Sequence, residues 1–370
     1  MFHRHVVPLL AFAFLLCAYA SLAFAQPAPI TIATGLNAPM GLHVDEGGTL
    51  FVVEAGMGGE DTLRMMAPGA AEPQELPFGP TSRLLRLDAG GSGAIDVVAA
   101  FPSVHMGMDV SGASRVVTHD GDFYVTSGAW IDTDGAAPPD WIGQVVRVDG
   151  VTGALSTVSD TWALEEAENP DGFILESHPY GLAFGPDGML YVADAGANTL
   201  LRIDPAGGAP EVVAVFDGVP GFVPNAARGG VVENDPVPTA VAFGTDGETY
   251  VSFLPGFPPA PGSGRVVRVH EDGSSVAYAD GTVLLTDLQA GPDGRLYAVR
   301  MADFGEQGPA PMTGALLRIE EGSVTEVANG LSFPTALAFD ADGNAFVTLN
   351  GVGAPGSGEV IRLDGVAAEN

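Results

Sequence analysis

A turn glycine followed three residues later by an aromatic residue recurs six times along this chain of 370 residues. A tight turn between antiparallel strands requires a positive φ, which glycine adopts without strain, so each copy predicts a β-hairpin. Because all six aromatic residues share one register, we expect them to form a structural layer between the repeats. The turn glycines are Gly48, Gly121, Gly188, Gly247, Gly294 and Gly343, and the aromatic residues are Phe51, Tyr124, Tyr191, Tyr250, Tyr297 and Phe346.

A third strand in each repeat carries an arginine, at Arg86, Arg147, Arg202, Arg268, Arg318 and Arg362. An acid usually follows two residues later, so we expect these arginines to form ion pairs within the scaffold. With a fourth strand, each repeat is a small sheet that cannot bury its own faces and must pack against its neighbours. The sequence therefore predicts an all-β fold, a six-bladed β-propeller of the NHL or lactonase type.

The N-terminal segment is expected to complete the last repeat, which ends soon after its third strand. Ile30–Leu36 resembles Val324–Leu331, which supplies the fourth strand of the fifth repeat. We therefore expect residues 30–36 to close the ring, which would remove exposed sheet edges. The second repeat is the least regular, because Arg115 falls in an otherwise apolar position of its first strand.

Residues 1–25 predict a secretory signal peptide, with Arg4 at a polar start, an apolar run over 6–22 and small residues at Ala23 and Ala25. Cleavage after Ala25 would leave residues 26–370 as a single propeller domain, secreted or periplasmic. An uncleaved membrane anchor is the alternative. The single cysteine, Cys17, lies in this segment, so the mature chain has neither disulfides nor thiolate metal sites.

The charge balance is strongly acidic, with 14 basic residues against 46 Asp and Glu and a formal net charge of −32 at pH 7. Such a chain repels nucleic acids and anionic membranes, so we expect neither a nucleic-acid partner nor stable membrane insertion after signal cleavage. Cationic ligands and divalent ions are compatible with this charge. Solubility in a salty exterior is the simpler explanation.

Extra residues accumulate between second and third strands and between successive repeats, and both kinds of connection emerge on the same face of a propeller. Long loops on one face of a rigid scaffold are where binding sites usually lie. We expect a small ligand or a protein partner to bind there. The candidate residues are Glu54, Asp109, Trp130, Trp141, Asn169, Asp171, Tyr180, Asp194, Asn198, Asp235, Arg300 and Asn350.

Oxygen ligands on this face could hold Ca²⁺ or another divalent metal, with Glu54, Asp109, Asp194 and Asp235 as the candidates. A bound metal could activate water for hydrolysis. His105 and His178 precede first strands and are the candidate catalytic residues, although such histidines more often form structural hydrogen bonds. An acidic rim with neither metal nor catalysis is the alternative, and the sequence requires no cofactor.

Other catalytic patterns are missing from the sequence, which contains neither His-Glu-x-x-His nor Gly-x-Ser-x-Gly. Gly351–Gly356 matches the glycine pattern of dinucleotide-binding sites. A predicted strand follows it rather than the helix that would receive a pyrophosphate, so we do not expect a dinucleotide site.

The blade motifs resemble the scytonemin-cluster D/E family (ScyD/ScyE family) of exported, NHL-like propellers. The resemblance covers essentially the whole mature chain. It rests on Glu165 through Asn169-Pro-Asp-Gly172, Ser177-His-Pro-Tyr180, Val192-Ala-Asp-Ala195, Val237-Pro-Thr239, Gly256-Phe-Pro258, Arg265-Val-Val-Arg268 and Gly356-Ser-Gly-Glu-Val360. The resemblance implies action outside the cytoplasm but no substrate and no catalytic residues. Two positions depart from the family pattern: His178 stands where Asn is usual, and Arg300 where an acid is common.

Three hypotheses follow from the sequence. The leading one is an exported propeller that binds a small ligand or a protein partner on its long-loop face, without clear catalytic apparatus. The second is a divalent-metal-dependent hydrolase of lactonase or esterase type. The third is a structural component of an extracytoplasmic complex.

Overall fold

The structure is a computed structural model that describes residues 28–87, 95–107 and 109–368. The predicted signal peptide lies outside these residues. The all-β prediction is confirmed, because almost all regular structure is antiparallel sheet. The described helices are α1 (Thr161–Glu168) and the short 3₁₀ helix η1 (Ala226–Arg228). No helix among the described residues is long and apolar enough to cross a membrane.

Six sheets, numbered here in chain order, carry the repeats. Sheet 1 contains β2 (Pro39–Val44), β3 (Leu50–Glu54), β5 (Gln74–Leu87), β6 (Ile95–His105) and β7 (Val110–Ser111), with β4 (Asp61–Met65) paired to β5. Sheet 2 contains β8 (Ala113–His119), β9 (Asp122–Ser127), β11 (Gln144–Val148) and β12 (Leu155–Asp160). Sheet 3 contains β14 (Pro179–Phe184), β15 (Leu190–Asp194), β16 (Thr199–Ile203) and β17 (Glu211–Val215).

Sheets 4, 5 and 6 repeat the four-stranded pattern. Sheet 4 contains β20 (Pro238–Phe243), β21 (Thr249–Phe253), β22 (Gly264–Val269) and β23 (Ser275–Thr282). Sheet 5 contains β24 (Leu285–Ala290), β25 (Leu296–Arg300), β28 (Gly314–Glu320) and β29 (Ser323–Leu331). Sheet 6 contains β30 (Leu337–Phe339), β31 (Ala345–Leu349), β32 (Gly358–Leu363) and β1 (Ile30–Leu36).

The N-terminal strand lies where the sequence predicts it. β1 pairs antiparallel with β32, with a register that runs from Ile30 opposite Arg362 to Leu36 opposite Gly358. The first strands of successive sheets contact one another in the order β2, β8, β14, β20, β24 and β30, and β30 in turn contacts β2.

The repeated aromatic residues pack between neighbouring sheets, as predicted. For four of the six, a ring of one sheet contacts a ring of the next sheet, whereas the ring of Tyr250 contacts Tyr278 of its own sheet. The ring centroids lie 4.8 Å apart for Phe51 and Phe123, 5.4 Å for Tyr124 and Phe184, 5.0 Å for Tyr191 and Phe243, and 5.0 Å for Tyr297 and Phe339. Such edge contacts favour aromatic pairs beyond the area that they bury.

The prediction for the repeated arginines is correct in part. Arg318 and Arg362 pair with the acid two residues later on their own strand. Arg86, Arg147 and Arg202 also form ion pairs within the scaffold, but with Asp96, Asp122 and Asp187 on or beside a neighbouring strand.

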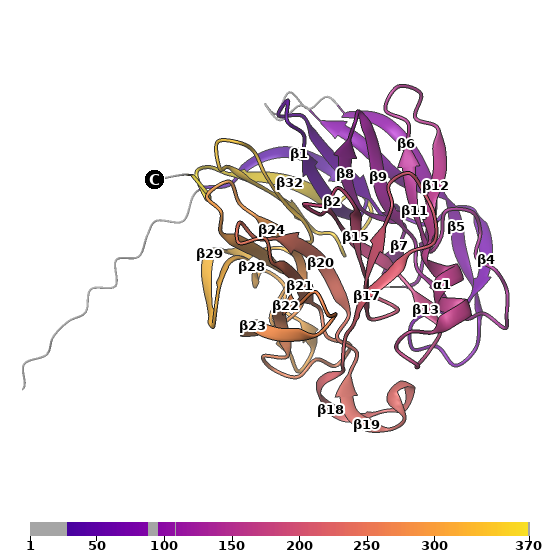
Figure 1. The fold of residues 1–370 in the computed structure, drawn as a ribbon. Coiled ribbons are helices and arrows are strands. Elements are labelled where there is room, and N and C mark those ends of the chain that lie inside the picture. Colours follow the sequence, from indigo (N-terminus) through magenta and orange to yellow (C-terminus); the bar gives the residue numbers. More distant parts are fainter. Residues whose placement is uncertain (1–27, 88–94, 108, 369–370) are drawn as a thin grey trace, which may run out of the picture.

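Insertions add small elements outside the six sheets (Figure 1). The strand β4 extends sheet 1, and α1 and the short pair β10 (Trp130–Ile131) and β13 (Glu176–Ser177) belong to the connections around sheet 2. β18 (Val219–Asn225) and β19 (Val231–Asn234) form a hairpin that projects at the bottom of the view. A last small pair is β26 (Phe304–Gly305) and β27 (Gly308–Pro309).

Candidate functional site

The space where the six first strands meet is occupied by Arg115. Its side chain is almost fully buried, and Nη1 donates hydrogen bonds to the carbonyl oxygens of Met40 and Ser114. Nη2 donates to the carbonyl oxygen of Thr335 at 3.1 Å and to that of Thr286. These contacts join sheets 1, 2, 5 and 6 through one guanidinium group.

Asp287 supplies the opposite charge. Its Oδ1 lies 3.7 Å from Nε of Arg115, and its Oδ2 accepts a hydrogen bond of 2.8 Å from the Leu337 backbone N–H. Burial raises the pKa of Asp287, and the Arg115 charge opposes that shift. A buried charge of this kind is tolerated because it is paired and hydrogen-bonded.

Small residues make room for this pair. Arg115 and Asp287 occupy the same position in the first-strand segments of their sheets. The other four sheets have a small residue at this position: Gly41, Gly181, Ala240 and Ala336. A Cβ added to Gly41 would lie 2.5 Å from the carbonyl oxygen of Ser114 and 3.1 Å from Cα of Arg115. Arg115 lies six residues before its turn glycine, whereas its counterparts lie seven residues before theirs, so the irregularity in the sequence reflects a hairpin that is one residue shorter in the second repeat.

Tyr180 and His178 lie against this centre. The Arg115 guanidinium carbon is 4.5 Å from the centroid of the Tyr180 ring, and the rings of His178 and Tyr180 meet edge to face at 5.3 Å. The Tyr180 hydroxyl is 4.0 Å from the sulfur of Met40. Burial, assisted by the Arg115 charge, lowers the pKa of His178 to about 4, so its ring is neutral at pH 7.

Five carboxyl groups beside His178 interact with one another, and we call them the acidic cluster: Glu165, Asp171, Glu176, Asp194 and Asp235. Glu165 comes from α1 and Glu176 from β13, while Asp194 ends β15. The helix is positioned by Asp160, whose side chain caps its first turn, and by Asn169, whose left-handed backbone ends it. The candidate Asn169 is thus a helix cap.

Burial is the main reason that proton affinity rises in the acidic cluster. It raises the pKa of Glu165 to about 8 and that of Glu176 to about 7, and repulsion from neighbouring carboxylates adds to both shifts. Burial also raises the pKa of Asp194, although Asp194 accepts four hydrogen bonds, from the backbone N–H groups of residues 178, 196 and 197 and from the Ser177 hydroxyl.

Asn198 and Arg228 bind the outer acids of the cluster. The Asn198 amide donates to Asp171 at 2.8 Å and reaches Asp235 at 3.5 Å. Arg228 donates to Asp235 at 2.7 Å and lies over the ring of Phe173, with 4.1 Å between its guanidinium carbon and the ring centroid. The structure therefore brings together the candidates His178, Asp194, Asn198 and Asp235, and it adds Glu176, which the sequence did not single out.

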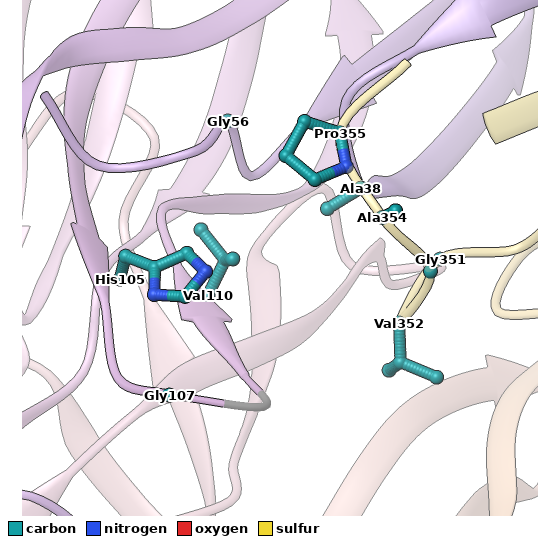
Figure 2. Close-up of a pocket in the computed structure, with 10 residues that line it drawn as sticks. Ala38, Gly56, His105, Gly107, Val110, Gly351, Val352, Ala354 and Pro355 are labelled. Carbon is teal, nitrogen blue, oxygen red and sulfur yellow. The ribbon is translucent and has the colours of Figure 1, made fainter. Parts of the chain in front are cut away.

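A pocket of about 270 Å³ lies near His105 (Figure 2). Its lining comes from parts of the chain that are far apart in the sequence: Ala38 and Gly56, then His105, Gly107 and Val110, and the glycine-rich loop 351–355. The His105 ring extends toward Val110 and the loop that carries Ala354. Asp109 lies in the same loop, keeps exposed surface and has its pKa raised by burial, with the His105 charge opposing that shift. We call this cavity the His105 pocket.

The remaining candidates have structural contacts and do not join these groups. Glu54 is fully buried and accepts hydrogen bonds from the Asn37 backbone N–H and from Arg83. Asn350 bonds to Ser332 and Ser357. Trp130 is buried, and Trp141 packs partly buried against the core. Arg300 pairs with Glu326 and Asp303 beside a second cavity near Phe304.

The proposed metal ligands do not fit a metal site. Within the part of the chain that the structure describes, no three His, Cys, Asp or Glu side chains are placed to hold a metal ion. The oxygens of Glu54 and Asp194 are already engaged by Arg83 and by backbone or hydroxyl donors. Asp109 lies between β6 and β7, and its carboxylate accepts a hydrogen bond from the Val110 backbone N–H.

Comparison with solved structures identifies the architecture. Over 91% of this chain and 99% of the other, the protein is similar to a candidate oxidoreductase (glucose dehydrogenase) from Thermus thermophilus, with 19% identity and a TM-score of 0.55. It is similar to a luciferin-regenerating enzyme over 93% and 97% of the two chains, with 9% identity and a TM-score of 0.54. The calcium-binding protein regucalcin from Agrobacterium tumefaciens gives 14% identity over 91% and 93%, with a TM-score of 0.52.

The chain has a β-propeller fold. At these identities the likeness concerns the fold alone. No protein-family model matches the chain, and no curated protein matches it either.

Two central residues were missed by sequence reasoning, Arg115 and Asp287. The signal was present, because they are the charged residues at a first-strand position that is otherwise Gly or Ala. It could be interpreted only once the register of all six strands was known.

Proposed function

We propose that this protein is an exported, six-bladed β-propeller, closed by β1, that binds a small ligand or a protein partner on its long-loop face. Six sheets whose first strands contact one another in sequence, with β1 paired to β32, support the blade count and the closure. The signal-peptide pattern of residues 1–25 supports export. The motif resemblance favours the scytonemin-cluster D/E family.

A binding role is supported by the position of Arg115, whose side chain fills the space where the six first strands meet. Arg115 bonds to residues of sheets 1, 2, 5 and 6 and contacts Tyr180 of sheet 3. Because these contacts fill the centre, a ligand would bind in the loops beyond Arg115. The His105 pocket and the acidic cluster both lie in these loops. The contacts from His178 through Tyr180 to Met40 connect the cluster to the apolar residues Ala38 and Val110 of the pocket.

Binding is favoured over metal-dependent hydrolysis by the condition of the carboxylates. A hydrolase of lactonase type would need several free oxygens that converge on one ion. Here Glu54, Asp194 and Asp235 are each held by donors of the protein. His178 packs edge to face against Tyr180, and its pKa of about 4 makes it a weak base, so it suits a contact surface better than general-base catalysis.

The test is ligand screening by thermal shift, with a library of small sugars, amines and lactones. Ala354 is exposed and lines the His105 pocket, so Ala354→Trp should fill the pocket and abolish shifts caused by ligands bound there. Ala206→Trp, at another exposed alanine in the turn after β16, is the matched control and should leave them intact. A library without any hit, or hits equally weakened by both variants, would contradict the proposal.

A further inference from the structure

We propose that the acidic cluster is the binding site for the ammonium group of an organic amine, an inference that rests on the proposed ligand-binding function. The proposal rests on two neighbouring residues: Glu176, whose half-buried carboxylate has no hydrogen-bond partner among the described residues, and the buried Glu165, which has one oxygen without a partner among them. Both belong to one group of acids in the loops near His178 and Tyr180.

Glu176 is the group that a ligand would meet first. Its side chain is half-buried, and its carboxylate accepts no hydrogen bond from any described residue. The path of the side chain depends on Gly196, where an added Cβ would lie 2.6 Å from Cγ of Glu176. Glycine at that position lets the carboxylate extend across the turn after β15.

Glu165 is a member of the acidic cluster whose carboxyl group is not fully hydrogen-bonded by the described residues. The residue is 1% exposed, and Oε1 accepts a 3.3 Å hydrogen bond from the Glu176 backbone N–H. Oε2 is buried and has no hydrogen-bond partner among the described residues. An unpaired buried acceptor of this kind costs free energy unless a proton or a cation satisfies the carboxyl.

The surrounding charges leave the cluster negative. Arg228 is already shared by Asp235 and Glu233, and Arg115 is paired with Asp287. The neighbouring His178 is uncharged near pH 7, because burial lowers its pKa to about 4. In their ionised forms Glu165, Asp171, Glu176 and Asp194 repel one another, which adds to the proton affinity of Glu165 and Glu176, and a positive ligand would favour the ionised forms.

An ammonium group fits this arrangement better than a metal ion does. The described carboxyl groups do not converge on one point, as a metal would require. An ammonium group has three donors pointing in different directions, and acceptors that are spaced apart can satisfy them at ordinary hydrogen-bond lengths. The carbon chain of the amine would lie against His178, Tyr180 and Met40, which contact one another beside the cluster.

The experiment compares 5-amino-1-pentanol with 1,5-pentanediol by isothermal titration calorimetry on the mature protein at pH 7 and about 0.15 M salt, where exposed charges are screened. We expect the amine to bind and the diol to show no heat of binding. Removal of a charged hydrogen-bond partner should weaken binding about tenfold or more in Glu176→Gln. Glu166→Gln, an exposed acid of α1 next to Glu165, is the matched control and should leave the affinity unchanged.

A second measurement keeps the proposal testable if Glu176→Gln does not fold. Because the carboxyl groups near the ligand hold protons at pH 7, binding of the amine should release protons, so the calorimetric enthalpy should differ between buffers of different ionisation enthalpy. Equal binding of amine and diol, equal losses in the two Gln variants, or an enthalpy independent of buffer would overturn the inference.

The outcomes also separate this inference from the proposed function. Library hits that Ala354→Trp blocks, without binding of the amine, would overturn the ammonium site and keep the binding role. Stoichiometric Ca²⁺ binding lost in Glu176→Gln would replace the amine by a metal. No binding of any probe would overturn both.

Discussion

The guanidinium of Arg115 lies 3.7 Å from the carboxylate of Asp287, which joins sheet 2 to sheet 5 across the space where the first strands meet. Both side chains are almost fully buried, so neither charge can be compensated by water. The pair is therefore both a connection between sheets and the base of the region in which we propose that ligands bind.

Removal of one member of this pair should be far more costly than removal of both. Arg115→Met leaves Asp287 buried without its partner and should lower the free energy of unfolding by about 3–5 kcal/mol. The double variant Arg115→Met/Asp287→Leu removes the unpaired charge as well and should recover a large part of that loss. Denaturant unfolding of both variants measures the difference, and additive losses would show that the two side chains do not interact.

Protonation of Glu165 should make the protein more stable in mild acid. Its folded pKa of about 8 lies above the value of 4.5 for a free carboxyl, so between these pH values the folded state holds a proton that the unfolded state has lost. The contribution is complete below about pH 4.5 and disappears as pH rises through 8, and it amounts to a few kcal/mol for so large a shift. The groups that face Glu165 are the acids Asp194, Asp171 and Glu176, which all act in the same direction.

Glu165→Gln isolates this effect. The substitution keeps the shape of the side chain without the titrating proton, so its melting temperature should match that of the wild type near pH 5 and exceed it at pH 9. Glu166→Gln on the exposed side of α1 should follow the wild-type profile. Parallel profiles for the wild type and Glu165→Gln would show that Glu165 is ionised normally.

Loss of β1 should destabilise the protein much more than a terminal truncation usually does. Deletion of residues 28–36 removes the strand that pairs with β32 and exposes that edge of sheet 6, together with core contacts of Ile32, Ala33 and Leu36. A synthetic peptide of residues 28–38, added in excess, should restore part of the melting temperature by strand addition. An unchanged unfolding curve after the deletion would show that β1 contributes little.

Gly196→Ala tests the position of Glu176. The new Cβ would lie 2.6 Å from Cγ of Glu176 and 2.9 Å from backbone atoms of Glu176 and His178, so the strand β13 must move. We expect a loss of about 1–3 kcal/mol in unfolding free energy, as for other overpacked sites, together with weaker amine binding. Gly47→Ala, where an added Cβ would lie 3.2 Å from the Asp45 side chain and 4.0 Å from the Thr49 hydroxyl, is the control for a simple Gly-to-Ala change.

The features of this fold that could be predicted from the sequence are those set by local or repeated sequence patterns. The strands and the hairpins at glycines such as Gly188 follow from residues within or close to each element, and the pairing of β1 with β32 follows from the likeness of Ile30–Leu36 to the fourth strand of the fifth repeat. The aromatic layer was also predictable, because one register places each ring on the same side of its sheet. The arginine ion pairs were predicted less well, since the acid that Arg202 reaches depends on the neighbouring strand.

The candidate site was predictable only in part, for a physical reason. Tyr180, Asp194, Asn198 and Asp235 could be assigned to one face because loop length and strand order determine the face. That they meet Glu176, and that Glu54 is instead held by Arg83, depends on how α1, β13 and the connecting loops pack.

The sequence by itself determined the strands, their order and the residues that each repeat contributes, because a period of two along a strand and a glycine in a turn act over a few residues. Only the tertiary structure decided which charges are paired. Arg115 and Asp287 are 172 positions apart in the chain, and burial acts on whatever side chains the folded chain brings together.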